Sequence, residues 1–400
     1  MNKKIAKFQW MQLLVLSGVH FLIDMFGGML PAILPAIMSE FGLRLSLAGI
    51  ILGVLHMTSN GFQVLTGHMR ARKRIPLFLH VGLILAAGIC LLGFLPRSDA
   101  AFTAMLVLAA VSGFGVAITH PESLRAVHRL RRIRPAVSTA VFMTGGFLGY
   151  ASGGAVSAVL VSRWGMPGLY PLLILPAVGM LLVILLRVRL SVGRISYNNN
   201  MTATVEYKLP FWLLFAMAMP AAISSFVLAS LLPTVLNELG FDLAFGGYSI
   251  TIFGIGGAVG SFVWAAVAHK KGELPCSIAA LFLAVPFLTA YLFLIEKAAA
   301  MWILFGVGFC AVSAYILMIT LARGAVGPNL GRRMGFMVGG TWALANIVFM
   351  SLLPVAEYFG TVLVLKFVPL GYVFSAAFGL LIILKLHRPI PAKQRPVSGS

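Results

Sequence analysis

The sequence predicts an all-α integral membrane protein with twelve transmembrane helices. Of its 400 residues, 60% are hydrophobic and only 10% are charged, against about 25% charged residues in soluble globular domains. Eleven stretches of 18 or more residues lack Asp, Glu, Lys and Arg, and a twelfth contains only Asp24. Each is long enough to cross the hydrocarbon core as a helix. Soluble domains, disordered chains and outer-membrane barrels, with their short alternating strands, are excluded.

The predicted spans follow one another along the chain without overlap. They are residues 8–39, 45–69, 75–96, 100–121, 135–162, 164–186, 209–237, 243–269, 274–295, 298–322, 334–356 and 367–384. The first resembles a secretory signal peptide, because Lys3, Lys4 and Lys7 precede an apolar run. It is too long for one and lacks a clear cleavage site, so we expect it to be retained as the first helix.

The net charge of +20 comes from 30 Lys and Arg against ten Asp and Glu. With twelve spans both termini lie on one side, and 25 of the basic residues fall in segments predicted for that side. The other five are Arg44, Arg97, Arg163, Lys297 and Lys366. Cytoplasmic loops carry the excess of Lys and Arg, so we expect both termini to be cytoplasmic in an inner or plasma membrane. The surplus is then an orientation signal, and no nucleic-acid partner is expected.

The two halves of the chain align at an offset of 198 residues, with Gly42 on Gly240 and Leu45 on Leu243. Because each half holds an even number of helices, both insert in the same orientation and pair around an axis along the membrane normal. The predicted divisions are a six-helix bundle at 1–186, a cytoplasmic linker at 187–208, a second six-helix bundle at 209–387 and a cytoplasmic tail at 388–400.

Asp24 is the one acid deep in a predicted span, where a charge costs on the order of a few kcal/mol. His20 precedes it by four residues, so both lie on one helix face. The pair is either a structural lock between helices or a proton-binding pair along a pathway. We favour the second, because carboxylate and imidazole pKa values respond strongly to burial and to each other.

The second span carries a polar stripe formed by His56, Asn60 and Gln63, followed on the same face by Gly67. Steps of four, three and four residues place them on one side of a helix. Such a stripe in a membrane helix faces either neighbouring helices, through hydrogen bonds, or a water-filled pathway. Both interpretations stay open, and the polar residues are candidates for the substrate cavity.

His120, Glu122 and Arg125 cluster around Pro121 at the end of the predicted span 100–121. Proline kinks a helix, and Glu122 and Arg125 have the spacing of a helical ion pair. The cluster is either a solvated helix end or, as we slightly favour, a gating or coupling group on the cytoplasmic side of the cavity.

The C-terminal half carries no Asp, Glu, Lys or Arg in the cores of its predicted helices. We therefore place proton coupling in the N-terminal half and expect neutral groups to line the cavity from the other side. The candidates on that side are Tyr248, Tyr315, Trp342 and Asn346, and Tyr150 of the N-terminal half is a further cavity candidate. A string of small residues, with glycines four apart, predicts close helix packing. It comprises Gly145, Gly149, Gly153 and Gly154.

No pattern in the sequence points to an enzyme, a metal or a cofactor. Cys90, Cys276 and Cys310 stand alone in apolar runs, without the spacing of a metal site. The glycines at 254–260 follow no predicted strand, so they are not a nucleotide-binding fingerprint. We expect a monomer whose partners are a small-molecule substrate, protons and the lipid bilayer.

Several of these residues resemble signatures of the major facilitator superfamily. The opening resembles that of its fosmidomycin-resistance branch at Gly18, Val19, His20, Phe21, Asp24, Leu30, Pro31, Leu34, Pro35, Phe41, Gly42, Leu43, Ala48 and Gly49. His120-Pro121-Glu122 is similar to a second signature of that branch, and the glycine string at 145–154 resembles the superfamily's antiporter motif. The resemblance implies an exporter of drugs or metabolites driven by inward proton flow, with Asp24, His20, His120 and Glu122 along the pathway.

Two positions depart from the pattern that the resemblance implies. The loop after the second span begins at Gly67 and reaches Arg72, with Ala71 in place of the acid that helps to latch the outward-open state. Tyr150 replaces the proline of the antiporter motif. We expect the glycine string, Gly67 and Arg72 to act in packing and gating.

The favoured function is secondary active transport by alternating access, with proton-coupled efflux of small organic molecules or drugs. One alternative is an importer or uniporter of a metabolite or organic anion. Another is a membrane sensor that does not transport. The sequence does not separate residues that line a cavity from residues that pack, so it leaves the substrate open.

Overall fold

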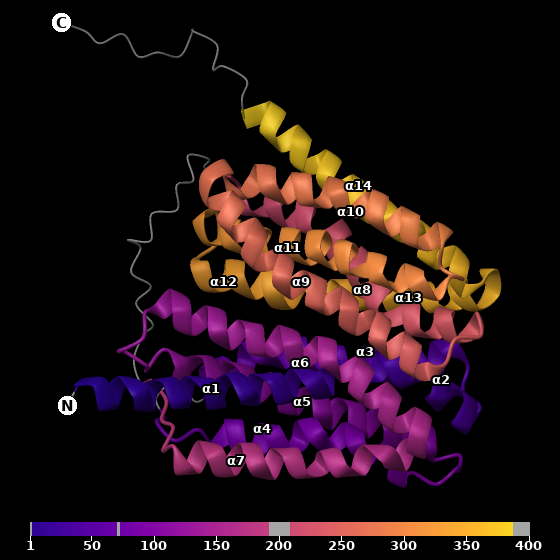
Figure 1. Ribbon diagram of the computed structural model, residues 1–400, viewed down its shortest axis with the longest axis horizontal. Coiled ribbons are helices and arrows are strands. Elements are labelled where there is room, and N and C mark those ends of the chain that lie inside the picture. Colours follow the sequence, from indigo (N-terminus) through magenta and orange to yellow (C-terminus); the bar gives the residue numbers. More distant parts are fainter. Residues whose placement is uncertain (1, 70–72, 192–208, 387–400) are drawn as a thin grey trace, which may run out of the picture.

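The computed structural model describes residues 2–69, 73–191 and 209–386, which form an all-helical bundle (Figure 1). Twelve described stretches are long and apolar enough to cross a membrane, which confirms the predicted all-α architecture of twelve spans. The helix α1 (Asn2–Gly27) begins at one face of the bundle, and α14 (Thr361–Leu386) ends at the same face. We call this the terminal face and the opposite one the distal face.

Several spans combine two or three consecutive helical elements. Between α1 and α14 the chain forms α2 (Leu30–Phe41), α3 (Leu45–Met69), α4 (Leu77–Ala86), η1 (Ala87–Phe94), α5 (Ala101–Val127), α6 (Pro135–Trp164), η2 (Met166–Ile174), α7 (Leu175–Leu185), α8 (Phe211–Glu238), α9 (Leu243–Lys271), α10 (Glu273–Phe293), η3 (Ala298–Trp302), α11 (Ile303–Gly324), α12 (Leu330–Met334), η4 (Gly335–Gly340) and α13 (Thr341–Phe359). Ala71, Arg72, most of the predicted linker and the predicted tail lie outside the described residues, so the division into two bundles stays a prediction.

The first span runs from Lys4 to Phe41 and comprises most of α1 and all of α2. Pro31 stands in the first turn of α2, where its missing N–H leaves no helical hydrogen bond unmade. At the break, Gly28 lies against α6, and a Cβ there would come within 2.3 Å of the carbonyl oxygen of Tyr150. The interruption therefore lets the backbone of the first span touch α6.

The same turn occurs at the same position in the two halves of the chain. α3 begins at Leu45 and α9 begins at Leu243, which is 198 residues later. Before each start, Gly42 and Gly240 have φ values of 64° and 90°, in the left-handed region that glycine adopts without a steric penalty. The equivalent turn needs a glycine in each half.

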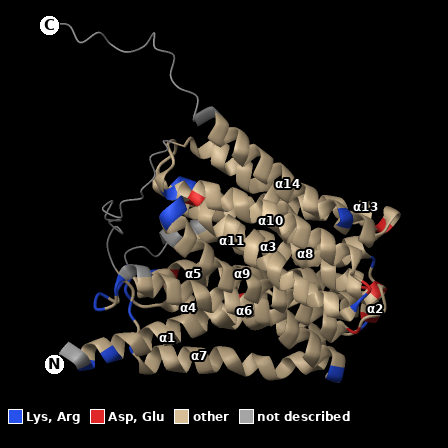
Figure 2. Cartoon of the chain, turned by 45° about the horizontal axis from the view of Figure 1, so that its top comes forward, with Lys and Arg blue, Asp and Glu red and all other residues tan. Residues whose placement is uncertain are grey.

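Charged residues gather at the two faces of the bundle and are sparse in its middle (Figure 2). At the distal face, Arg97 and Glu40 form an exposed ion pair of 3.7 Å. Asp242 caps α9 by accepting a 2.6 Å hydrogen bond from the backbone N–H of Phe245, which satisfies one of the free donors at a helix start. The distribution is that of a bundle whose middle lies in hydrocarbon.

α6 packs against α1 through one face of its glycine string. Gly145, Gly149 and Gly153 follow one another at four-residue steps, and each would meet a backbone carbonyl of α1 if it carried a Cβ, at 2.5, 2.1 and 2.3 Å. Those carbonyls belong to Ser17, Phe21 and Met25. Small residues allow such close backbone approach between membrane helices, so the string sets the separation of α1 and α6.

The other side of α6 meets α9, which belongs to the second half of the chain. Gly154 and Gly247 face each other, and a Cβ on Gly247 would lie 2.5 Å from the carbonyl oxygen of Gly154. The hydroxyl of Thr251 donates a 2.6 Å hydrogen bond to the carbonyl of Ala151. These contacts lie in the later turns of α6 and the early turns of α9, near the distal face.

α3 and α13 form a second seam between the halves, also toward the distal face. The backbone N–H of Ser46 donates to Glu357 Oε1 at 2.6 Å. One turn further along α3, Gly49 leaves room for the side chain of Leu353 on α13. One turn beyond that, Gly53 leaves room for the side chain of Met350. The described halves are thus closed against each other at the distal side.

Replacing Gly149 by alanine tests the contact between α1 and α6. The new Cβ would lie 2.1 Å from the carbonyl oxygen of Phe21, and a backbone atom yields only if the helix moves. We expect a loss of about 1–3 kcal/mol in the free energy of unfolding, seen as a lower thermal midpoint of the protein in detergent.

Gly18→Ala on α1 is the matched control, because no heavy atom lies within 4 Å of its Cβ position. We expect it to keep or raise the midpoint, since alanine favours helix over glycine. Equal midpoints for the two variants would contradict a helix separation set by Gly149.

Candidate functional site

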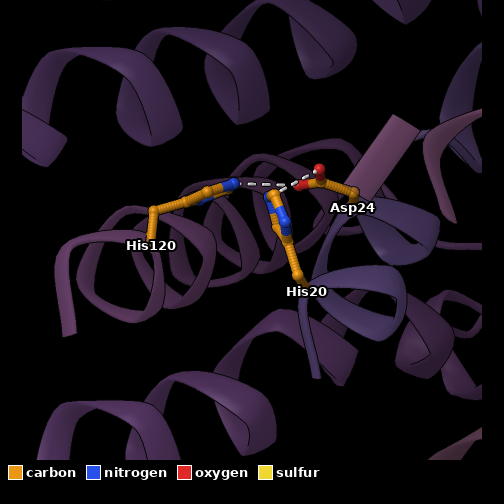
Figure 3. A group of neighbouring side chains, drawn as sticks. All are labelled: His20, Asp24 and His120. Carbon is orange, nitrogen blue, oxygen red and sulfur yellow. Dashed lines mark ion pairs between the residues drawn. The ribbon is translucent and has the colours of Figure 1, made fainter. Parts of the chain in front are cut away.

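Three titratable side chains from two helices meet inside the N-terminal half (Figure 3). His20 and Asp24 lie on one face of α1, and His20 Nε2 is 3.2 Å from Asp24 Oδ2. His120 of α5 approaches the other carboxylate oxygen, with Nε2 3.1 Å from Oδ1. The two imidazole rings stand edge to face, with centroids 5.0 Å apart. We call these residues the His–Asp–His triad.

Hydrogen bonds around Pro121 orient the ring of His120 on α5. Proline lacks the N–H that would bond to the carbonyl four residues earlier, and the Thr66 hydroxyl of α3 donates to that carbonyl, of Ala117, at 3.0 Å. His120 Nδ1 lies 3.0 Å from the carbonyl of Val116 on its own helix. The ring is thereby turned so that Nε2 points at Asp24.

α6 supplies the wall behind His20. The imidazole of His20 stacks on the ring of Phe142, with centroids 4.1 Å apart, and its Nδ1 lies 2.8 Å from the carbonyl of the same residue. One turn on, Gly146 leaves the space that the triad fills, because a Cβ there would come within 2.5 Å of both His20 and Asp24. His20 is only 2% exposed.

The hydrogen bonds assign the tautomers of both histidines. A carbonyl only accepts hydrogen bonds, so Nδ1 of each ring carries a proton. In a neutral imidazole the other nitrogen is then a bare acceptor, and it would face a carboxylate that also only accepts. Each contact between Nε2 and Asp24 is therefore favourable only when a proton lies between the two atoms. The triad has two such positions.

The triad also has the composition of some metal sites. Its three ligand-type atoms lie within 4.8 Å of one another, and two imidazoles with one carboxylate bind several transition metals. The sequence predicts no metal, and the effect of a chelator on transport distinguishes a metal site from a proton site.

Glu122 and Arg125, predicted to act with His120, point elsewhere. Glu122 is 2% exposed, and its Oε2 accepts a 3.1 Å hydrogen bond from the backbone N–H of Leu79 in the first turn of α4. Arg125 donates to the backbone carbonyls of Lys73 and Ser191 at 2.9 and 2.8 Å. The carboxylate of Glu122 stabilises the start of α4. Through these hydrogen bonds, Glu122 and Arg125 hold the end of α5 against neighbouring segments.

A cluster of rings lies where the two halves meet. Phe226 of α8 contacts His56 of α3 at 5.2 Å and Trp342 at the start of α13 at 6.1 Å, between ring centroids. Tyr150 of α6 lies 6.4 Å from His56, and Tyr315 of α11 lies 5.3 Å from Trp342. We call these five residues the ring cluster. Four of them were predicted as cavity residues, and Phe226 was not.

The element η4 shapes the cluster beside Trp342. Residues 335–340 form one π-helical turn, a feature that interrupts regular helices and is frequent at functional sites. The hydroxyl of Tyr315 donates to the carbonyl of Met337, and that of Thr341 donates to the carbonyl of Phe336 at 3.1 Å. Side-chain hydroxyls thus satisfy carbonyls at the irregular turn.

Two buried polar atoms near the cluster lack a hydrogen-bond partner among the described residues: His56 Nε2 and Asn346 Oδ1. Asn346 is fully buried, and its amide nitrogen donates to the carbonyl of Gly53, one turn before His56 on α3, at 2.9 Å. A buried polar atom without a partner is costly, so the two atoms are candidates for contacts to a bound molecule.

The remaining predicted residues take other positions. The Asn60 amide donates to the carbonyl of His56 on its own helix at 3.0 Å. Gln63 is partly buried on α3, and Gly67 lies in the last turn of that helix. Tyr248 is 44% exposed on α9, and the structure does not bring it to the ring cluster.

Some residues of the site could not be found from the sequence. Phe142 acts through its carbonyl and ring, and Phe226 is one of 29 phenylalanines, none distinguished by spacing. Gly146 is not part of the glycine string and lies one position beyond the face that contacts α1. Its role becomes visible only when the side chains of His20 and Asp24 are placed beside it.

The sequence profile of the Major Facilitator Superfamily matches residues 16–350. The chain belongs to this superfamily. It is therefore a multi-pass membrane transporter of the secondary type, and not an enzyme. Proteins of the superfamily bind small-molecule substrates within the membrane.

Two curated relatives of the superfamily match parts of the chain. A segment of 151 residues is 29% identical to the fosmidomycin resistance protein of Escherichia coli (strain K12), covering 38% of this chain and 36% of that protein. A segment of 158 residues is 28% identical to the uncharacterized MFS-type transporter YfnC of Bacillus subtilis (strain 168), covering 39% and 38%. The matches thus span little more than a third of each relative.

Solved structures of other transporters share the fold over nearly the whole chain. A POT family transporter in complex with 5-aminolevulinic acid superposes with a TM-score of 0.69 at 14% identity, covering 94% of this chain and 97% of that one. A mutant of the nucleoside transporter NupG gives 0.65 at 14% identity, covering 93% and 98%. At these identities the likeness concerns the fold alone.

Substitutions of Glu122 test its structural contact with α4. Glu122→Ala leaves the buried N–H of Leu79 without this acceptor, and we expect a loss of about 1–3 kcal/mol in the free energy of unfolding. Glu122→Gln keeps an amide oxygen as acceptor, so its thermal midpoint in detergent should fall less. If the alanine variant were as stable as the wild type, the contact with α4 would not be structural.

Proposed function

We propose that the protein exports small organic molecules by alternating access and that inward movement of protons drives the export. The observation that carries the proposal is the His–Asp–His triad, which places two exchangeable proton positions within the membrane-spanning part of α1 and α5. A structural lock between helices needs no second imidazole at the same carboxylate. The second imidazole gives the carboxylate a second proton position, which suits a group that binds and releases protons.

The triad changes its charge as its two proton positions fill. With no bridging proton, one carboxylate and two neutral imidazoles carry a charge of −1, and with both positions filled the charge is +1. Charges within a low-dielectric interior interact strongly with their surroundings. Proton loading therefore changes which arrangement of the helices is stable, which is what coupling requires.

The contacts between the halves support the alternating-access part of the proposal. The described halves close against each other through α3–α13 and α6–α9 near the distal face. We propose that residues 1–186 and 209–387 are the two units that rock around a central site, as in transporters built from two parallel repeats. The structure then corresponds to a state closed at the distal face.

The ring cluster is the proposed substrate site. It contains side chains from both halves, so a molecule bound there touches both moving units. Aromatic walls with a few polar atoms are typical of small-molecule sites, and His56 Nε2 and Asn346 Oδ1 supply free polar atoms. We therefore propose an organic substrate with an aromatic or apolar body and few hydrogen-bonding groups.

We propose that the terminal face lies in the cytoplasm and that the protein acts as a monomer in an inner or plasma membrane. The support for the orientation is the excess of Lys and Arg in the segments assigned to that face. Protons that enter the triad from the distal side and leave at the terminal side would then move inward. Glu122 and Arg125 are proposed to hold the end of α5 in place during this cycle.

Asp24→Asn is expected to abolish coupling without removing the site. Asparagine has nearly the same shape and still accepts a hydrogen bond, but it cannot ionise. In proteoliposomes, transport driven by an imposed pH gradient should fall at least tenfold, while exchange of substrate without a gradient persists. The probes are fosmidomycin and a panel of neutral and cationic aromatic compounds.

Asp99→Asn, an exposed acid at the distal face, is the matched control and should transport like the wild type. Gly146→Ala keeps all three titratable groups but pushes on His20 and Asp24, and it should weaken coupling as well. Normal gradient-driven transport by Asp24→Asn would refute the coupling role. Loss of wild-type transport in a chelator would assign the triad to a metal instead.

Phe226→Ala is expected to weaken substrate binding. The ring contacts both His56 and Trp342, and losing one aromatic wall should raise KM roughly tenfold. The pH dependence of transport should stay that of the wild type, because the triad is intact. Phe374→Ala, on an outward-facing ring of α14 that is 63% exposed, should leave KM unchanged. Equal KM values for the two variants would exclude Phe226 from the substrate site.

A further inference from the structure

A basic pocket opens near the terminal face, apart from the triad and the ring cluster. Its volume is about 280 Å³, and it lies between the first turns of α1, the end of α5 and the segment that follows α7. We propose that this pocket binds the phosphate of an anionic phospholipid. The inference goes beyond the proposed function and does not depend on the direction or coupling of transport.

Three arginines provide the charge of the pocket. Arg129 follows α5, and Arg187 and Arg189 follow α7. No carboxylate is among the residues that line it, and none of the three arginines forms an ion pair with a described carboxylate. The guanidinium group matches the geometry of phosphate oxygens, and basic pockets between membrane helices bind anionic headgroups. The charge therefore favours a phosphate-bearing ligand.

The rest of the lining favours a lipid over a free phosphate ion. The floor is apolar and consists of buried side chains, among them Leu16, Leu130 and Val188. On α1, Ile5 and Phe8 are each 41% exposed and also line the pocket. These residues belong to the first turns of a span that starts at Lys4, where headgroups meet acyl chains. A phospholipid covers this apolar edge, and an inorganic anion does not.

The walls are tied together, so the pocket exists before a ligand arrives. The Gln12 amide of α1 donates to the carbonyl of Leu186, at the end of α7, at 2.9 Å. Gln9 Oε1 accepts a 2.8 Å hydrogen bond from the backbone N–H of Arg132, in the segment after α5. A preformed site loses less entropy when a ligand binds.

The backbone at Arg187 supports a binding role. Arg187 has φ of +50°, and among the described residues it is the one non-glycine residue with a positive φ. Its neighbour Val188 donates a 3.1 Å hydrogen bond back to the carbonyl of Val183, as in the helix ends at which glycine usually stands. Strained residues of this kind concentrate at functional sites, and glycine at this position would remove both the strain and the charge.

The test is a titration of the purified full chain in detergent, with the thermal midpoint as the readout. The probes are short-chain phosphatidylglycerol, short-chain phosphatidylcholine and inorganic phosphate. We expect phosphatidylglycerol to raise the midpoint with saturation, and the other two to have little effect. An equal effect of phosphatidylcholine would overturn the role of charge, and an equal effect of inorganic phosphate would overturn the lipid.

Variants locate the effect at the pocket. Arg129→Gln, Arg187→Gln and Arg189→Gln should each weaken the response to phosphatidylglycerol about fivefold. The matched control is a variant that removes three other exposed arginines from the terminal face. Those positions are Arg131, Arg134 and Arg332. The pocket triple variant, which combines the three pocket substitutions, should lose the response. If the control triple variant lost it as fully, the lipid would bind elsewhere.

Arg187→Gly separates binding from folding. Glycine adopts a positive φ without strain, so the midpoint without lipid should be at least that of the wild type, while the apparent affinity for phosphatidylglycerol falls about fivefold. A variant that folds and binds phosphatidylglycerol like the wild type would overturn the assignment of Arg187 to the site. Substrate exchange by the Arg187→Gly variant in phosphatidylcholine vesicles, which contain no anionic lipid, measures the transport site independently of the lipid pocket.

Discussion

A carboxylate inside a membrane bundle must have its charge balanced by its neighbours, because no bulk water is there to solvate it. Asp24 meets this requirement when protons lie between its oxygens and two imidazoles from different helices. The surrounding features follow from that arrangement. The carbonyl of Phe142 fixes the ring of His20, the carbonyl of Val116 fixes that of His120, and the missing side chain at Gly146 leaves room for His20 and Asp24.

The helix that borders this carboxylate also forms the seam between the halves. One face of α6 lies against the carbonyls of α1 through glycines, and its other side meets α9 through Ala151 and Gly154. Packed cores switch between discrete arrangements and do not deform continuously. In the proposed mechanism, a change of charge at Asp24 therefore acts on a rigid helix that already contacts the other half.

The pairing of His20 with Asp24 could be predicted from sequence, because residues four apart share a helix face whatever the fold. The partner from α5 could not be assigned in the same way. His120, Glu122 and Arg125 are close in sequence, but residues two apart point to different sides of a helix. His120 turns toward Asp24, and Glu122 turns toward the start of α4. Proximity along the chain suggested one cluster, and helix geometry separates it into two.

By itself the sequence determined the twelve spans and the sorting of basic residues between the two ends of those spans. These properties depend on single segments, on their length against the hydrocarbon core and on the charge of the loops. Only the tertiary structure decided which helices touch, which glycine faces which carbonyl, and that Phe226 joins His56 and Trp342 at the seam. The physical reason is that lipid and protein interior are equally apolar. The buried and lipid-facing sides of a membrane helix therefore carry the same residue types, and hydrophobic periodicity does not tell them apart.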